Sequence, residues 1–531
     1  MLSLLSALDY GGWILHALLW LPLVGMVAVL FGPEARAKQV AFWSSLGVFL
    51  LSVGLWWAFE QGVAGFQMAS STPWISGWGV SYALGIDGIS LFMVLLTTLT
   101  IPLAALGSYN YIHKKERAFY ALLLLLETGI LGVFLSMDLF LFYVFFELTL
   151  VPMYFIVGVW GGERRIYAAV KFFLYTALGS LLMLVAILYL YFRARAAHGV
   201  GTFAYLDLLD VTLTIKEQLW LFGAFALAFS IKVPLFPLHT WLPDAHVEAP
   251  TPGSVVLAAV LLKMGTYGYI RFLLPLFPGA AQHETVVALM LALGTIGILY
   301  AAWVAAVQPD AKKLVAYTSV AHMGFVVIGV FGLTVNGLQG GLMVMISHGL
   351  STGALFLLLG MLYERRHTRM IEEFGGLAEV APWLATAFVI TALASIGLPG
   401  TSGFVGEFLA LLGTFELHPW TAGIASIGVI FAAYYMLPMV QRMFFNGLTN
   451  EHNRGIHDLS PRELAILAPL IALMIWVGVQ PAALMSRMQP SVEAVLERVH
   501  SQAPGAGLVG MASEPLAADP AADPAAATEG R

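Results

Sequence analysis

Four charged side chains lie inside long apolar stretches, where a charge needs a specific reason to persist. Glu147 lies in DLFLFYVFFELTLVPMYF, Lys232 in FSIKVPLFPLHTWLP, Lys263 in VVLAAVLLKMGTYGY and Glu407 in GLPGTSGFVGEFLALL. A charge at the centre of a bilayer costs about 2.5–3.5 kcal/mol on insertion scales. Two acids and two bases could hold helices together as ion pairs. We favour a proton relay, because a carboxylate that approaches or leaves a buried lysine changes the balance between its charged and neutral forms.

Three histidines, His239, His322 and His348, lie in or beside the same apolar stretches. One such histidine alone would indicate packing. Three of them in the same set as two lysines favour a hydrogen-bonded relay, because imidazole titrates near neutrality. A metal site formed by His239 and His246 is disfavoured, since their spacing crosses a proline-rich turn and no cysteine assists. Glu127 is a further acid in an apolar stretch and an alternative partner for a lysine.

The composition predicts that membrane-spanning helices carry these residues. The chain of 531 residues is 60% hydrophobic and 11% charged, whereas soluble domains have about 25% charged residues. Apolar blocks of roughly 20 residues match the length of a helix that crosses a bilayer. We therefore predict an all-α polytopic membrane protein with about fourteen spans, near 12–32, 38–60, 87–110, 117–136, 139–160, 167–192, 218–240, 250–274, 284–307, 313–332, 338–362, 382–413, 419–445 and 463–486.

Several chemistries are disfavoured within this chain. The absence of cysteine excludes disulfides, thiolate-bound iron–sulfur clusters and cysteine-based zinc sites. The net charge of −6 offers no basic surface, so nucleic acid is not an expected partner. We find no phosphate-binding loop or dinucleotide fingerprint, and expect neither a cofactor nor a metal in this chain.

The distribution of basic residues predicts an orientation. Loops after odd-numbered spans hold 15 of the 25 Lys and Arg residues, and the opposite loops hold seven. Because basic loops remain on the inner side, we expect a multi-pass protein of the inner (plasma) membrane with both termini on the outer, periplasmic side.

Two proline-containing stretches indicate an internal repeat. SIKVP at 230–234 resembles SIGLP at 395–399, five predicted spans later. An odd number of spans inverts one half relative to the other, as in transporters whose pathway lies near the bilayer midplane. Pro234, Pro237 and Pro399 would break the helices that contain them, and the freed carbonyls would need partners or water. Simple kinks and water-accessible half-channels remain alternative consequences of these breaks.

These observations divide the chain into five parts. The first 116 residues contain three spans and an outer loop, 61–86, which could form a small hairpin. Two inverted five-helix repeats follow, and then a last span with a short amphipathic segment. A disordered Ala/Pro-rich tail is expected at the end. The predicted boundaries are 1–116, 117–274, 284–445, 446–500 and 501–531.

The apolar stretches with their charged residues resemble the antiporter-like membrane subunits of respiratory complex I, the proton-translocating NADH:quinone oxidoreductase. The resemblance runs from about residue 85 to 445 and is most specific in HTWLPDAHVEAPTPGSVVLAAVLLK. Related subunits and Mrp antiporters usually have lysine at the position of Glu407. The glutamate in GFVGEF is similar to the NuoM-type branch, called subunit 4 in mitochondria.

The resemblance implies a role for each candidate residue. It implies Glu147 and Lys232 as a coupled pair, Lys263 as the central residue and Glu407 as the terminal site, with His239, His322 and His348 connecting them. It also implies NuoL-like and NuoN-like subunits as neighbours, with lipid around them. Flavin, iron–sulfur clusters and quinone would be bound by partner subunits.

Three functions remain open from the sequence. The first is proton translocation as a subunit of NADH:quinone oxidoreductase. The second is a subunit of a multi-subunit cation/proton antiporter or of a ferredoxin- or hydrogenase-linked relative, and Glu407 disfavours the antiporter. The third is an inert membrane scaffold, which the buried Lys and Glu residues disfavour.

Overall fold

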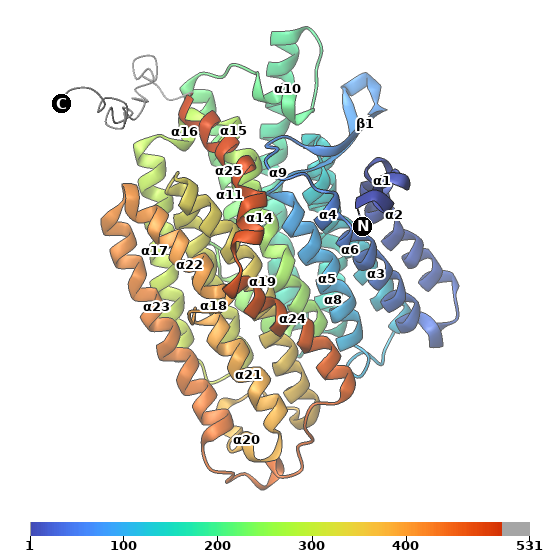
Figure 1. Ribbon diagram of the computed structural model, residues 1–531, viewed down its shortest axis with the longest axis vertical. Coiled ribbons are helices and arrows are strands. Elements are labelled where there is room, and N and C mark those ends of the chain that lie inside the picture. The colour runs from blue at the N-terminus through green and yellow to red at the C-terminus, as the bar shows by residue number, and fades with distance from the viewer. Residues whose placement is uncertain (1, 502–531) are drawn as a thin grey trace, which may run out of the picture.

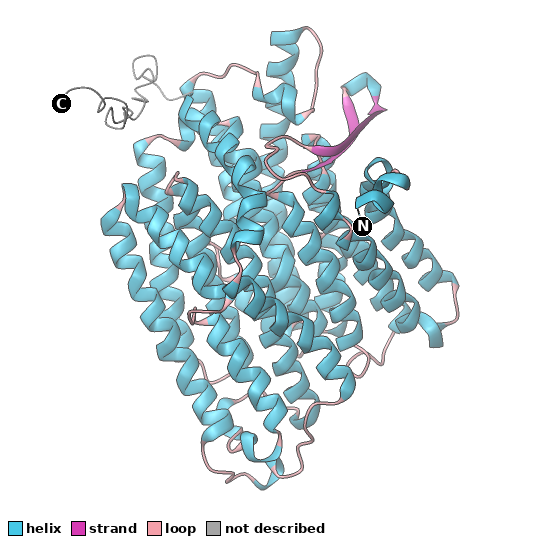
Figure 2. Ribbon diagram, viewed as in Figure 1, coloured by secondary structure: helices cyan, strands magenta, loops and turns pink. Residues whose placement is uncertain are grey.

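Long helices running in roughly one direction make up most of the chain in the computed structural model, which describes residues 2–501 (Figure 1). These residues contain one two-stranded sheet, which Figure 2 shows at one end of the bundle. The Ala/Pro-rich tail predicted over 501–531 lies, beyond Ser501, outside the described residues. We call the end of the bundle near β1 and α10 the upper face, and the end near α20 the lower face (Figure 1).

The first proline-containing break lies between residues 232 and 241. The part of the chain before it contains the N-terminal helices, the strand pair and the helices that follow them. Its elements are α1 (Leu2–Ala7), α2 (Tyr10–Phe31), η1 (Glu34–Arg36), α3 (Ala37–Val53), α4 (Leu55–Ala58), β1 (Gln67–Ile75), η2 (Ser76–Trp78), β2 (Val80–Ile86), α5 (Ser90–Gly107), α6 (Glu116–Leu135), α7 (Leu139–Leu148), α8 (Leu150–Trp160), α9 (Arg165–His198), α10 (Tyr205–Leu209) and α11 (Ile215–Lys232).

A densely packed middle section follows the first break. It consists of α12 (Trp241–Glu248), α13 (Thr251–Val256), η3 (Leu257–Leu261), α14 (Leu262–Gly268), η4 (Tyr269–Leu273), α15 (Leu274–Leu276), α16 (Pro278–Ala281), α17 (Glu284–Ala306), α18 (Ala311–Phe331) and α19 (Val335–Arg366). The described chain ends with η5 (Ile371–Glu373), α20 (Leu377–Val380), α21 (Pro382–Ser395), α22 (Ser402–Leu417), α23 (Pro419–Val440), η6 (Gln441–Phe445), η7 (Glu451–Asn453), α24 (Pro461–Val479) and α25 (Ala482–Ser501).

Within residues 2–501, twelve helices are long and apolar enough to cross a membrane, against the fourteen spans predicted from the sequence. The two predicted spans without such a helix are 218–240 and 382–413, which contain the proline breaks. The second of these consists of two short helices, α21 with 14 residues and α22 with 16. The polytopic all-helical architecture is confirmed, whereas the number of spans and the inverted repeat remain predictions.

At the first break, α11 ends at Lys232 and the helical direction resumes only at Trp241. Prolines at 234 and 237 have no N–H to donate, so carbonyls of the preceding turn lose their usual partners. The indole Nε1 of Trp241 donates to the carbonyl of Ile231 at 2.9 Å. A buried side chain therefore satisfies one exposed carbonyl, as an apolar environment requires.

At the second break, glycines supply the backbone freedom. Gly397 and Gly400 have φ angles of +78° and +90° between α21 and α22, a region that side-chain-bearing residues rarely occupy. The chain turns here without continuing the helix, and Pro399 lies between the two glycines. Lys232 immediately precedes one break, and Glu407 lies on the first turns after the other.

The upper face carries two additional elements. Strands β1 and β2 form an antiparallel hairpin, with pairs from Gln67 with Ile86 to Ile75 with Val80. Helix α25 is amphipathic and buries one side, including Met488, Val492 and Val499. Its side chains reach distant segments: Ser491 accepts a hydrogen bond from the Gly88 N–H at 3.1 Å, and Arg498 donates to the Pro275 carbonyl at 2.9 Å.

Candidate functional site: a buried relay of lysine, histidine and glutamate

Lys263 lies at the centre of the molecule and is completely buried. It belongs to the short helix α14, between the π-helical segments η3 and η4. Such segments interrupt regular helical hydrogen bonding and are frequent at functional sites. The Nζ atom of Lys263 donates to the Ala258 carbonyl at 2.5 Å and lies 2.6 Å from Nδ1 of His348. The lysine is thus fixed by its own helix and aimed at an imidazole.

His348 reaches Lys263 because α19 packs closely against η3. A Cβ atom at the neighbouring Gly349 would lie 3.0 Å from the Ala259 carbonyl and 2.6 Å from the side chain of Leu96. Any larger residue would push α19 away from the lysine. The glycine therefore permits the short contact between His348 and Lys263.

A second short contact joins His322 of α18 to Glu407 of α22. His322 Nδ1 lies 2.6 Å from Oε1 of Glu407, and both side chains are buried. The other ring nitrogen of His322 lies 3.4 Å from the hydroxyl of Ser395, at the end of α21. The second break also faces this carboxylate, since a Cβ at Gly397 would lie 3.2 Å from Oε2 of Glu407.

The two contacts are adjacent and form a series. The rings of His322 and His348 have centroids 5.7 Å apart in an edge-to-face arrangement. Lys263, His348, His322 and Glu407 therefore follow one another through the core, each on a different helix. Every group in the series can bind and release a proton, and an imidazole can accept at one nitrogen and donate at the other. This geometry is suited to moving protons through an apolar core.

Glu147 and Lys232 are arranged differently. Lys232 is buried, and its Nζ atom has no hydrogen-bond partner among the described residues. It lies 5.1 Å and 5.6 Å from the ring centroids of Phe146 and Phe172, within the range of cation–π attraction. Glu147 is close enough for the two charges to interact. Its Oε1 atom also has no hydrogen-bond partner in the described chain. The structure places the predicted pair together without a direct bond.

His239 lies apart from the other two histidines. It is buried in the first break, where its ring stacks on Phe236 at 5.7 Å and meets Tyr300 edge-on at 5.3 Å. Its Nδ1 atom has no hydrogen-bond partner in residues 2–501. His322 and His348 are thus brought into one series, whereas His239 belongs to the first break.

Glu127 of α6 is fully buried, and neither of its oxygens has a hydrogen-bond partner among the described residues. The same residues contain no group of three or more His, Cys, Asp or Glu side chains that could hold a metal ion. The structure does not bring Glu127 to either lysine as a partner.

Two buried cations and one histidine were not singled out from the sequence. Arg271 is buried and forms an ion pair with Asp87. Lys312 is also buried. His246 was considered only as a metal ligand. Each lies close to a predicted helix end, where a sequence does not distinguish an exposed side chain from a covered one.

Comparisons with known proteins define the class. Residues 136–432 match the family model described as NADH:quinone oxidoreductase/Mrp antiporter, TM. Residues 19–137 match a second model, described as NADH-ubiquinone oxidoreductase chain 4, amino terminus. The chain belongs to this family of antiporter-like membrane subunits. The second match shows that the family signal also covers the N-terminal helices.

The individual relatives point to one branch of the family. The chain is 46% identical to NADH-quinone oxidoreductase subunit M of Rhodobacter capsulatus, over 88% of this chain and 93% of the relative. It is 42% identical to subunit M of Rickettsia prowazekii (strain Madrid E), over 91% and 98%. A chain of the respiratory complex I from Thermus thermophilus with bound NADH has a TM-score of 0.83 and 38% identity, over 91% of this chain and 99% of that one.

Proposed function

We propose that this chain translocates protons as the M-type membrane subunit of an NADH:quinone oxidoreductase. The observation that supports this proposal most directly is the buried series of Lys263, His348, His322 and Glu407. Electrons pass through other subunits, which bind the flavin, the iron–sulfur clusters and the quinone. The relatives named subunit M, each aligned over nearly its whole length, favour this parent complex.

Each buried residue has a role in this proposal. Glu147 and Lys232 form a coupled pair, and Lys232 precedes the first break, in which His239 lies. Lys263 is the central proton carrier, and His348 and His322 connect it to Glu407. Glu407 is the terminal site from which the proton leaves. A charged Lys232 is favoured when Glu147 is ionised and disfavoured when Glu147 is neutral, so the pair can control proton movement toward Lys263.

The orientation follows the basic loops. The lower face is the inner side of the plasma membrane, and the upper face with both termini is periplasmic. NuoL-like and NuoN-like subunits are the membrane neighbours, and lipid covers the remaining apolar surface. In mild detergent, the chain should migrate in a complex far larger than its own mass. Recovery as a stable, isolated monomer that transports protons would contradict this assignment.

A cation/proton antiporter subunit is the alternative, and one measurement separates the two. Sealed inverted vesicles that contain the assembled complex should acidify when NADH is added, without requiring sodium or another exchangeable cation. A pH-sensitive dye reports the acidification. Proton movement that follows an imposed cation gradient, and does not respond to NADH, would favour the antiporter.

A further inference from the structure

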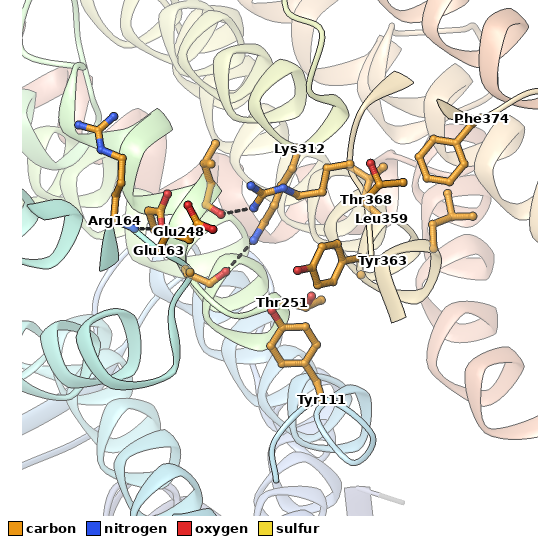
Figure 3. Close-up of a pocket in the computed structure, with 16 residues that line it drawn as sticks. Tyr111, Glu163, Arg164, Glu248, Thr251, Lys312, Leu359, Tyr363, Thr368 and Phe374 are labelled. Atoms are coloured by element: carbon orange, nitrogen blue, oxygen red, sulfur yellow. Dashed lines mark hydrogen bonds between the residues drawn. The ribbon is translucent and has the colours of Figure 1, made fainter. Parts of the chain in front are cut away.

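The two ends of the bundle differ in how they are closed. A cavity of about 260 Å³ opens on the lower face and is lined by polar side chains that include Glu248 and Lys312 (Figure 3). Toward the upper face, the helical segment that carries Lys263 contains a buried arginine, Arg271, of which 4% is exposed. Arg271 follows Lys263 by eight residues, which corresponds to about 12 Å along a helix. The relay described above does not use this arginine.

An ion pair with Asp87, just before α5, holds Arg271 in place. The Oδ1 atom of Asp87 accepts hydrogen bonds from the backbone N–H groups of Ile89 and Ser90, at 3.1 Å and 3.0 Å. Its Oδ2 atom faces the guanidinium. Both charged side chains are almost completely buried. Separating a buried pair leaves each charge without a partner, which is strongly unfavourable, so the pair keeps the guanidinium in one position.

Aromatic rings fill the space around this guanidinium. Its central carbon lies 4.8 Å from the ring centroid of Phe66, and 5.6 Å and 5.9 Å from those of Tyr267 and Tyr205. The Tyr267 hydroxyl accepts a hydrogen bond from the arginine Nε at 3.3 Å and donates one to the Phe134 carbonyl at 3.4 Å. A backbone carbonyl accepts hydrogen bonds but has no proton to pass on. The hydroxyl that lies between the lysine and the arginine therefore does not extend the relay toward the upper face.

We propose that Arg271, held by Asp87, closes the upper end of this helical segment to protons, so that a proton on Lys263 leaves only sideways, through His348. This inference rests on the proposed function and identifies a residue that gives the transfer its direction. Each member of a relay must bind and release a proton, whereas a guanidinium keeps its proton in proteins. The upper face is the side to which protons are pumped, so an open path from there to Lys263 would let them return.

The first experiment replaces the permanent cation by a group that can release its proton. Arg271→His in the intact complex can still pair with Asp87, but imidazole binds and releases protons near neutrality. We expect the number of protons pumped per NADH oxidised to fall several-fold in sealed vesicles, while NADH oxidation continues. Arg271→Lys retains a cation beside Asp87 and should pump with the wild-type ratio. An assembled Arg271→His complex with the wild-type ratio overturns the inference.

The matched control is the same substitution at the opposite end of the bundle. Arg365 forms an ion pair with Glu463 on the lower face at 2.7 Å, and their side chains are 15% and 5% exposed. Arg365→His therefore changes a partly buried arginine that does not belong to the segment of Lys263. It should keep the wild-type ratio of protons to NADH, even if the complex melts at a lower temperature. An equal fall of this ratio in both variants would indicate a general loosening of the bundle and overturn the role of Arg271.

A second measurement follows the leak without NADH. A potassium diffusion potential set with valinomycin should drive protons across vesicles with the Arg271→His complex several-fold faster than across wild-type vesicles, as reported by a pH-sensitive dye. Adding Lys263→Met to this variant should abolish the additional leak, because the path then ends at a side chain that does not bind protons. An additional leak that persists in the double variant overturns the inference, since the protons would not pass through Lys263.

A paired substitution takes the place of Arg271→His if that variant does not assemble. Arg271→Ser combined with Asp87→Ser removes both charges together, so no unpaired ion remains buried. The two hydroxyls can hold water in the space that the larger side chains leave. This double variant should leak protons in the same assay, and a complex as tight as wild type overturns the inference.

Lys263→Met alone separates this inference from the proposed function. It should abolish pumping if the buried series carries protons at all. If Lys263→Met pumps normally, the proposed function fails. If Lys263→Met is inactive while the assembled Arg271→His complex pumps with the wild-type ratio and shows no additional leak, only the closure by Arg271 is wrong.

Discussion

The two regions that contain the lysine–glutamate sites differ in how their charges are held. In the region of Lys263 and Glu407, each charged group meets a histidine at 2.6 Å. In the region of Glu147 and Lys232, the lysine faces two aromatic rings and has no hydrogen bond among the described residues. A bonded series holds groups in place for transfer, whereas an unbonded pair is free to change its separation. The comparison suggests that one region conducts and the other controls.

The largest effect should follow from Lys263→Met. Methionine fills similar space but removes the group that contacts both Ala258 and His348. We expect pumping to fall to background in sealed vesicles while assembly persists, because replacing a buried charge by an apolar residue need not destabilise a protein. Lys216→Met removes an exposed lysine and should leave pumping unchanged. If the Lys263→Met complex still pumps protons at a substantial rate, the region of Lys263 and Glu407 does not conduct them.

Substitutions of Glu407 should have the next largest effect and can be ranked. Glu407→Gln retains the shape but cannot release a proton, and Glu407→Ala also removes the contact with His322. Both should pump close to background. Glu407→Lys restores a group that titrates, so it should retain more pumping than either. A pH-sensitive dye would test this order by comparing proton pumping in vesicles that contain equal amounts of assembled complex. If all three variants pump like wild type, Glu407 has only a structural role.

A smaller effect is expected for Glu147→Gln. The substitution removes the charge that favours protonated Lys232, but no hydrogen bond to Lys232 is lost. We expect pumping and coupled NADH oxidation to decrease together by about tenfold, which corresponds to ~1.4 kcal/mol. Thermal stability of the complex should be unchanged. A large loss of stability would indicate that the pair holds helices together, and unchanged pumping would remove its controlling role.

The smallest effect should come from His239→Phe. His239 stacks against Phe236 and lies outside the bonded series, and phenylalanine preserves that packing. We expect pumping to change by less than about twofold, or ~0.4 kcal/mol. If His239→Phe reduces proton pumping as much as Glu147→Gln does, His239 belongs to the controlling region. The two regions would then be less distinct than the contacts indicate.

The candidate site could be located from the sequence because membrane helices are apolar. Glu147, Lys232, Lys263 and Glu407 were conspicuous as charges within apolar stretches, and the two breaks were visible as proline and glycine. The sequence did not reveal which residues touch. His348 reaches Lys263 because Gly349 lets α19 pack closely against η3. The π-helical segments on either side of Lys263 have no recognisable sequence pattern. Lys312, His246 and Arg271 were underestimated because their burial depends on loops folding over helix ends.

Helix α25 also has a mechanical consequence. It crosses the upper face and is fastened along its length, by Arg487 to the Trp56 carbonyl, by Ser491 to Gly88 and by Arg498 to Pro275. Each of these attachment points lies more than two hundred residues before the α25 residue that contacts it. A helix attached at several points in this way resists the sliding of one group of helices past another. We therefore expect displacements during turnover to involve side chains and the two interrupted helices more than the surrounding bundle.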